Sequence, residues 1–290
     1  MDIVYHIGAH GTGEFDLLKC LQKNATKLEQ EDIVFVPQKR FRPVLRDAVS
    51  KLKGAPASPD MQEAMLDAML DTDHAKRIIL SHNNFLCTAG HAVKGGSIYP
   101  MAGPEAAKLR NLFPELQVGF CMGVRNPATF LPALFTMMDE QDFASFTSNV
   151  DLAELSWSNT ILRICEAVPD APIAVWCYED TPLLWPNILQ TITGHAAETA
   201  LIGYDDFLAT IMTSDGLSRL QGFIAEHPPQ TEDRRRHVVG AFLEKFGLPD
   251  EMEMEIDLPG WSQDIIDGLT EVYDEDMRMV EDLPGVTLLM

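Results

Sequence analysis

A short segment near the start of the chain has the residue types and spacing of an anion-binding loop. The apolar run Ile3–Ile7 predicts a strand, and Gly8 and Gly13 follow it. A helical pattern then begins at Glu14. A strand, a glycine loop and a helix in this order place backbone N–H groups and the positive end of a helix around one cavity. The chemistry expected in this glycine loop (residues 8–13) is therefore the binding of a phosphate or a similar anion.

The residues after the loop differ from those of a nucleotide-hydrolysing P-loop. Such a loop continues with Lys and then Ser or Thr, because the Lys reaches the phosphates and the hydroxyl binds magnesium. In this chain Gly13 is followed by Glu14 and Phe15. The sequence also offers no persuasive magnesium-binding acid. We therefore expect neither an ATPase, a GTPase or a kinase nor a metal site.

The elements that must position the loop form an alternating pattern. Five apolar, β-rich runs predict strands at 2–7, 32–37, 77–81, 117–124 and 172–178. Several of them are nearly continuous in hydrophobicity, which is typical of parallel strands that are buried on both faces. Helical patterns lie between them, at 14–28, 42–52, 60–70, 104–113, 127–138, 151–168 and 183–192. The predicted fold class is α/β, with a three-layer αβα arrangement around a mainly parallel sheet.

The part of the chain after Asp205 reads as helical. Its patterns predict helices near 215–226, 232–246 and 262–280, and the signal for the main sheet has ended. Residues 251–261 alternate charged and apolar types, which is compatible with an edge strand or an exposed partner segment. A chain of 290 residues fits one large domain or one domain with an appended part. We expect a single α/β domain over residues 1–290, with a core over about 1–200 and a C-terminal helical extension over about 205–290.

Composition limits the partners and the compartment. The chain has 22 Lys and Arg residues against 44 Asp and Glu residues, a net charge of -22, which repels nucleic acid and anionic lipid. No run of eighteen apolar residues and no secretory signal is visible. The five cysteines lack CxxC spacing and read as reduced core residues. We expect a cytoplasmic protein that has neither a nucleic acid nor a membrane as partner.

Two segments resemble the sulfotransferase family. The first resembles the phosphate loop of bacterial members, whose chains begin near HIGAHKTGTTSLQ, and the positions that match in register are His6, Ile7, Gly8, Ala9, His10, Thr12, Gly13 and Leu17. The second, GVRNPATFLPALF (123–135), is similar to the family's strand that ends in Arg-x-Pro and leads into a helix, and it matches at Arg125 and Pro127. RIILSHNNF (77–85) resembles a further strand of bacterial relatives.

The resemblance implies a sulfotransferase-like P-loop fold and an activity. Members transfer a sulfuryl group from 3′-phosphoadenosine-5′-phosphosulfate to an alcohol or amine, here a small-molecule acceptor. Arg125 would bind the 3′-phosphate, and His10 or His82 would take the acceptor proton as general base. For each histidine the alternative is a hydrogen-bonded structural role. The loop positions that would hold the co-substrate are Gly8, Ala9, Gly11, Thr12 and Gly13.

The chain departs from the family at contacting positions. Gly11 replaces the loop Lys, the pair Glu14 and Phe15 replaces two Thr, Asp16 replaces a Ser, and Ala133 replaces the Ser that would help to bind the 3′-phosphate. Losing one charge-stabilising group costs about 3–4 kcal/mol in a transition state. Two functions therefore remain open. One is a sulfotransferase-like enzyme whose loop works through backbone N–H groups, and the other is a catalytically inactive binding or scaffold protein of the same fold.

Two of the departures introduce carboxylates. Glu14 and Asp16 in the first helical turn stabilise the helix dipole by about 0.3–1 kcal/mol each. They also place negative charge where a phosphosulfate would lie. We hypothesise that the protein fills its anion site from within, with the Glu14 carboxylate capping the loop. The alternative is that both residues are ordinary acids of a helix N-terminus.

One basic stretch stands out in this acidic chain. Between residues 39 and 53 the only acid is Asp47, and the cations are Lys39, Arg40, Arg42, Arg46, Lys51 and Lys53. This stretch is a local positive island that could guide an anionic ligand. The alternative interpretation is one solvated face of a helix.

Overall fold

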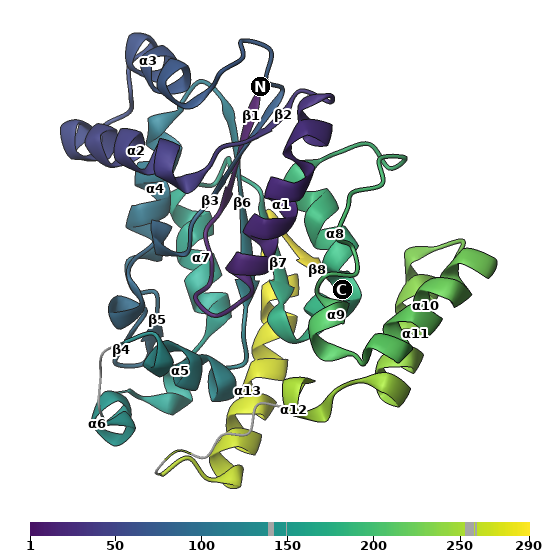
Figure 1. The fold of residues 1–290 in the computed structure, drawn as a ribbon. Coiled ribbons are helices and arrows are strands. Elements are labelled where there is room, and N and C mark those ends of the chain that lie inside the picture. Colours follow the sequence, from purple (N-terminus) through teal and green to yellow (C-terminus); the bar gives the residue numbers. More distant parts are fainter. Residues whose placement is uncertain (139–141, 149, 253–257, 259) are drawn as a thin grey trace.

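A computed structural model of the chain describes all residues except 139–141, 149, 253–257 and 259 (Figure 1). The strands of the described residues are β1 Asp2–His6, β2 Ile33–Phe35, β3 Arg77–Ser81, β4 Val93–Lys94, β5 Ser97–Ile98, β6 Gln117–Val124, β7 Ile173–Cys177 and β8 Val286–Leu289. All five predicted strands are therefore confirmed, with small changes at their ends.

Helices connect these strands. They are α1 Glu14–Glu29, α2 Gln38–Leu52, α3 Pro59–Met69, α4 Ala102–Leu112, α5 Pro127–Thr136, α6 Phe143–Thr147, α7 Trp157–Ala167, α8 Thr181–Thr193, α9 Leu208–Ile211, α10 Ser214–Glu226, α11 Glu232–Phe246, α12 Pro249–Met252 and α13 Gln263–Glu281. Short 3-10 turns are η1 Asn83–Phe85, η2 Ala89–His91, η3 Leu152–Glu154 and η4 Tyr178–Asp180.

The central sheet has the strand order β2-β3-β1-β6-β7-β8, and every neighbouring pair is parallel. In the middle of the sheet, Ile3 of β1 lies opposite Ile78 of β3 and Val118 of β6. All three side chains are buried. The continuous apolar runs thus reflect strands that are covered by helices on both faces.

Two hydrophobic cores form the layers on either side of the sheet. Alternate residues of β1 point to opposite faces, so Tyr5 belongs to one core and Val4 to the other. The core that contains Tyr5 includes residues of α2, α3, α4, α5, α7 and α13. The core that contains Val4 includes residues of α1, α8, α9, α10 and α11. The three-layer αβα arrangement is therefore confirmed.

Local capping explains where several helices begin. Ser58 accepts a hydrogen bond from the Met61 N–H at the start of α3, and Asn126 accepts one from the Ala128 N–H at the start of α5. In both helices a proline occupies the first turn. A backbone N–H at this position would have no acceptor within the helix, so the missing N–H of proline costs no hydrogen bond. α5 follows β6 directly, so its cap lies beside Arg125.

The structure corrects the sequence predictions in three places. The expectation that the main sheet ends before Asp205 is wrong, because β8 pairs with β7 and places Val286 opposite Ile173. The edge strand considered at 251–261 falls mostly outside the described residues. The single helix expected at 151–168 is divided into η3 and α7, because the Ser156 side chain caps α7. α2 begins at Gln38 rather than Arg42, directly after Pro37.

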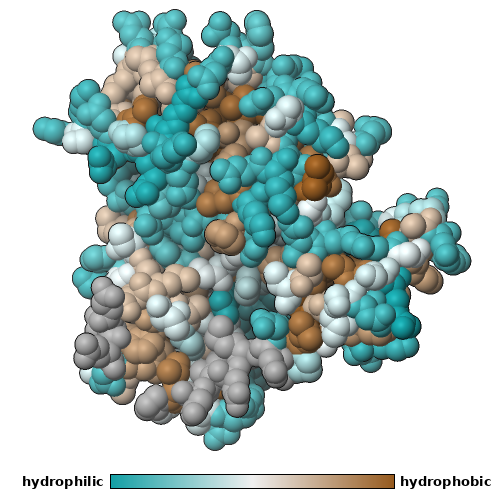
Figure 2. All heavy atoms as spheres, viewed as in Figure 1, coloured by the Kyte–Doolittle hydropathy of each residue, from teal (hydrophilic) through white to brown (hydrophobic). Residues whose placement is uncertain are grey.

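The five cysteines are all free thiols. Within the described ranges, no helix is both long and apolar enough to cross a membrane. Hydrophilic residues cover most of the face shown in Figure 2, and hydrophobic residues come to the surface there in separate patches.

Candidate functional site

The candidate site lies at the carboxyl ends of the central strands. After β1 the chain continues to β2, which lies beyond β3 on one side of β1. The strand on the other side of β1 is β6. In parallel α/β sheets, ligands bind outside the carboxyl ends of the strands where the direction of winding changes. The segments that meet at this position are the glycine loop after β1, residues 82–84 after β3, Arg125 after β6 and Tyr178 after β7.

Positive φ angles and contacts with β6 shape the glycine loop. Gly8, Gly11 and Gly13 have φ angles of 113°, 70° and 80°, in a region where glycine has no Cβ penalty. The Ala9 N–H donates to the Gly123 carbonyl oxygen over 2.8 Å, and the Gly123 N–H donates to Gly8 over 2.8 Å. The N–H of Ala9 is therefore engaged with the protein itself.

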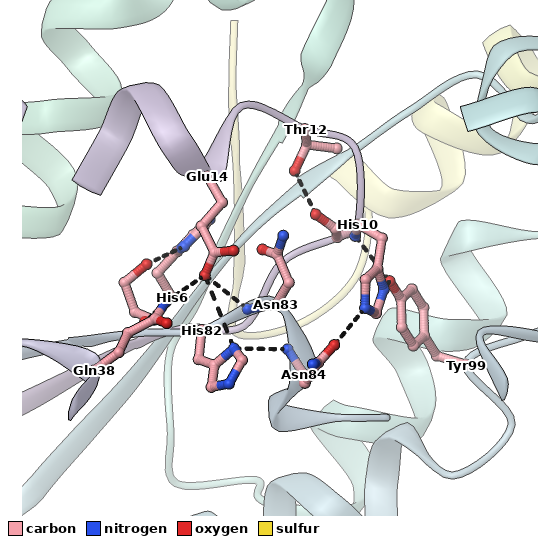
Figure 3. Close-up of polar contacts among 11 residues, drawn as sticks. His6, His10, Thr12, Glu14, Gln38, His82, Asn83, Asn84 and Tyr99 are labelled. Carbon is pink, nitrogen blue, oxygen red and sulfur yellow. Dashed lines mark hydrogen bonds and ion pairs between the residues drawn. The ribbon is translucent and has the colours of Figure 1, made fainter. Parts of the chain in front are cut away.

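Thr12 stabilises the loop from inside. It is 4% exposed, and its Oγ1 donates to the carbonyl oxygen of Ala9 over 2.8 Å (Figure 3). A side chain on Gly123 would come within 3.1 Å of Thr12. The Thr12 hydroxyl is thus engaged in a hydrogen bond with the loop backbone.

Backbone donors remain at the start of α1. The N–H groups from Gly11 to Asp16 have no hydrogen-bond acceptor among the described residues. Gly13 at the N-cap supplies no side chain to satisfy them. These donors and the positive end of the helix dipole are the features that suit an anion.

Arg125 is fixed against the glycine loop. Its Nη1 donates to the Gly11 carbonyl oxygen over 2.8 Å, and its Nε donates to Thr129 Oγ1 over 2.9 Å. The guanidinium carbon lies 4.8 Å from the centre of the Tyr178 ring, in a cation–π contact. Burial lowers the pKa of Arg125, and Tyr178 partly offsets this shift.

Close packing explains why position 11 is glycine. A Cβ at Gly11 would lie 3.2 Å from Ala133 Cβ and 3.3 Å from Arg125 Nη1. The first stem atoms of a lysine at position 11 would therefore have to displace these side chains. The two departures from the sulfotransferase pattern, at positions 11 and 133, are thus neighbours in space, and small residues at both let the loop lie close to α5.

Glu14 points to the end of β3 (Figure 3). Its Oε1 accepts hydrogen bonds from the Asn83 N–H over 2.9 Å and from Gln38 Nε2 over 3.0 Å. Burial raises the pKa of Glu14, while these two hydrogen bonds oppose the shift. The hypothesis that Glu14 caps its own loop is wrong, because its hydrogen bonds go to segments after β2 and β3.

His10 is enclosed by two hydrogen bonds (Figure 3). Its Nε2 lies 2.8 Å from Asn84 Oδ1, and its Nδ1 lies 2.5 Å from the Tyr99 hydroxyl. Because Asn84 Oδ1 only accepts, the His10 proton lies on Nε2, and the Tyr99 hydroxyl donates to Nδ1. The lone pair that a general base would use is therefore engaged. Burial also lowers the pKa of His10.

His82 is also committed through one nitrogen. Its Nδ1 accepts a hydrogen bond from the Asn84 N–H over 3.1 Å and lies 4.0 Å from the Glu14 carboxylate. Burial, with the charge of Arg42 adding to it, lowers the pKa of His82 to about 4. Near neutral pH the ring is uncharged and carries its proton on Nε2, so it presents a hydrogen-bond donor rather than a base.

A cavity of about 330 Å³ lies beside the start of α1. Among its described lining residues, Arg125 is the only cation, and the acids are Asp16, Glu179 and Glu251. Burial raises the pKa of Asp16 and of Glu179. The described charges in this cavity are therefore predominantly negative.

The structure brings together the predicted residues of the loop, His10, His82 and Arg125, and it adds partners that the sequence did not single out. Tyr178 is the last residue of the predicted strand at 172–178 and directly follows β7, so its place at a strand end was a usable signal. Tyr99 had no such signal. It is 1% exposed and has a φ of 44°, a conformation that costs roughly 1–2 kcal/mol for a non-glycine residue.

No group of three or more His, Cys, Asp or Glu side chains that could hold a metal ion occurs in the part of the chain that the structure describes. Neither a comparison with protein-family models nor a search of curated proteins finds a match to this chain. The function is therefore argued from the geometry of the site.

Proposed function

We propose that this chain is a sulfotransferase-like protein that binds a small molecule and does not transfer a sulfuryl group. The observation that carries the proposal is the hydrogen bond from Arg125 to the Gly11 carbonyl oxygen. In the family that the loop resembles, an Arg binds the 3′-phosphate and a Lys occupies position 11. In this chain the Arg is held against the loop, in the space where that Lys side chain would begin.

Electrostatics give further support. The cavity beside the helix start is lined by three carboxyl groups and one guanidinium among the described residues. 3′-Phosphoadenosine-5′-phosphosulfate carries several negative charges, so these carboxylates would repel it. The lost Lys and hydroxyl contacts would each remove about 3–4 kcal/mol of transition-state stabilisation. The residues present do not fit a phosphosulfate group, and we derive no transfer step.

A second candidate function rests on the N–H groups from Gly11 to Asp16, which lack protein acceptors within the described ranges. They could bind the donor through the backbone alone, in an active sulfotransferase-like enzyme. Arg125 would then have to leave Gly11, and His10 would have to give up its contact with Tyr99. The proposal needs neither rearrangement.

Calorimetric titration with 3′-phosphoadenosine 5′-phosphate, the desulfated donor product, tests the two candidates without an acceptor. We expect no binding up to millimolar concentration. Micromolar binding that is lost in Arg125→Ala but retained in Arg219→Ala would overturn the proposal in favour of the enzyme. Arg219 is a suitable control because it forms an exposed ion pair with Asp215 on α10.

The free thiols and the net charge bear on the compartment and the partners of the protein. We propose a cytoplasmic location, in keeping with five free thiols. The net charge of -22 supports a small-molecule ligand rather than nucleic acid or an anionic membrane surface. A ligand that is itself anionic would need a local positive site.

A further inference from the structure

A groove of about 590 Å³ lies between α2, η1 and α4, outside the cavity beside α1. Binding sites for small molecules in proteins typically measure roughly 300–1,000 Å³. In Figure 1, α4 lies directly beneath α2, and η1 follows β3. The groove therefore has the size of a ligand site and borders the residues after β3 that contact the glycine loop.

Cations from two helices line this groove. Lys39, Arg42 and Arg46 come from α2, at spacings of three and four residues that place them on one helix face. None of these three forms an ion pair with a described acidic side chain. Lys108 of α4 also lines the groove and pairs with Glu105 over 2.7 Å. We call this lining, together with its apolar floor, the cationic groove.

This charge pattern is unusual for the chain. Acids outnumber cations by 44 to 22, so a random surface patch of this protein would be acidic. The groove instead holds four cations and a single described acid. The charge of Arg42 also acts on Glu14 and His82. A positive field in this position favours an anion, and two neighbouring guanidinium groups can bind one oxyanion with several hydrogen bonds.

The floor of the groove is apolar. Phe41, Leu45 and Leu109 are buried, and Phe85 and Val49 are partly exposed. These side chains come from α2, η1 and α4, so the floor extends across the groove. A small inorganic ion would leave the partly exposed side chains of Phe85 and Val49 in contact with water. A ligand with an apolar body would cover these two side chains, at a gain of about 25 cal/mol for each Å² of apolar surface removed from water.

Polar residues that follow β3 also line the groove. Among them are His82 and Asn84. His82 carries its proton on Nε2, because Nδ1 accepts from the Asn84 N–H. Asn84 Oδ1 in turn accepts from His10. The groove is therefore connected to the glycine loop through Asn84, which is hydrogen-bonded to both His82 and His10.

We propose that the cationic groove binds an amphipathic anion, with its oxyanion head on Arg42 and Arg46 and its aliphatic or aromatic body over the partly exposed side chains of Phe85 and Val49. This inference rests on the proposed function, because it names the ligand class of a protein that binds without transferring a sulfuryl group. The head can be a sulfate ester or a carboxylate, since both present oxygen acceptors to guanidinium groups.

Calorimetric titration with octyl sulfate tests the inference, with 1-octanol as the body alone and inorganic sulfate as the head alone. We expect octyl sulfate to bind at least about tenfold more tightly than either half. Octanoate is expected to bind through the same residues. Equal affinity for octyl sulfate and 1-octanol, or no binding of octyl sulfate, would overturn the inference.

A charge-matched pair of variants locates the site. The double variant Arg42→Gln and Arg46→Gln is expected to weaken octyl sulfate binding at least about tenfold. The double variant Lys51→Gln and Arg219→Gln removes the same charge from exposed ion pairs outside the groove, and we expect its affinity to stay within about twofold of the original chain. An equal loss in both variants would assign the effect to net charge and refute a site at the groove.

The titration with 3′-phosphoadenosine 5′-phosphate on the same samples separates the two proposals. Absence of octyl sulfate binding refutes the proposed ligand of the cationic groove and leaves intact the proposal that the chain does not bind the nucleotide donor. Nucleotide binding that depends on Arg125 refutes the latter proposal and has no bearing on the ligand of the groove.

Discussion

The Glu14 carboxylate accepts a hydrogen bond from the Asn83 N–H over 2.9 Å, and it thereby joins the first residue of α1 to the turn after β3. Gln38, at the start of α2, donates to the same oxygen and also to the Ser81 carbonyl oxygen. Three segments of the chain thus meet at one half-buried carboxyl group. Their arrangement sets both the start of the helix and one end of the cationic groove.

Replacing Glu14 by Gln tests the effect of burying this carboxyl group. Burial raises its pKa above the usual value of 4.5. The folded state therefore binds the proton more tightly than the unfolded state, and the contribution of Glu14 to stability falls as the pH rises through these two pKa values. Because Gln cannot ionise, we expect the free energy of unfolding of Glu14→Gln to rise relative to the original chain between about pH 4 and pH 7. Urea unfolding of both proteins across this range measures the difference, and a constant difference would contradict the prediction.

Replacing Glu14 by Ala removes the acceptor as well as the charge. The N–H of Asn83 then loses its partner, and we expect the free energy of unfolding to fall by about 1–3 kcal/mol relative to Glu14→Gln. Urea unfolding near neutral pH measures this difference. Equal stability of the two variants would show that the hydrogen bonds contribute little.

The packing at Gly11 can be separated from its backbone conformation. Gly11 and Gly95 both have positive φ angles, 70° and 58°, but a Cβ at Gly95 would meet no atom within 4 Å. Gly11→Ala and Gly95→Ala should therefore share a conformational cost of about 1–2 kcal/mol. We expect Gly11→Ala to lose about 1–3 kcal/mol more, because its methyl group presses on Arg125 and Ala133. Thermal unfolding compares the two variants, and equal losses would mean that the loop has room for a side chain.

Asp276 of α13 holds the start of α7. It is 2% exposed, and it accepts hydrogen bonds from the Trp157 N–H over 2.5 Å and from the Ser158 N–H over 3.1 Å. We expect Asp276→Ala to lower the free energy of unfolding by about 2–4 kcal/mol, because buried donors lose a charged acceptor. Asp274→Ala on the exposed side of the same helix is the control and should change it by less than about 0.5 kcal/mol. Urea unfolding of the two variants measures both values, and similar losses would refute a specific role for Asp276.

The free thiols offer a test of burial. Burial raises the pKa of Cys87 and of Cys121 to about 12, and that of Cys20 and of Cys177 to about 11. Since the thiolate is the reactive form, alkylation at about pH 8 should be slow in the folded protein. Iodoacetamide should modify all five cysteines rapidly in urea and slowly in the folded protein, and mass spectrometry measures the extent of labelling. Rapid labelling of Cys121 in the folded protein would contradict its buried position.

The sequence predicts the strands and the main helices because their signals are local. Continuous apolar runs mark strands covered on both faces, and the glycine loop marks the start of α1 at Glu14. β8 was missed although Val286–Leu289 is itself a short apolar, β-rich run, because it follows a long series of helical patterns. Its place is fixed by pairing with a strand more than a hundred residues earlier.

The candidate site was predictable in its position but not in its contacts. The loop was found from residue types and spacing, and Arg125 was found from the resemblance of residues 123–135 to a sulfotransferase segment. The hydrogen bond between Arg125 and Gly11 joins residues 114 positions apart. It depends on how closely α5 approaches the loop, which the residues themselves do not reveal. The same holds for Glu14, whose partners belong to two other segments.

The late position of β8 along the chain has a consequence for assembly. β7 gains its second partner strand only from a segment that follows α8 to α13, the six α-helices described between the two strands. Long-range pairing of this kind is slow, because the entropy of a large loop is lost before the contact is gained. Until β8 docks, β7 presents an unpaired edge of apolar residues, which can pair with another chain. We expect this edge to be the place where the folding protein is most prone to aggregate.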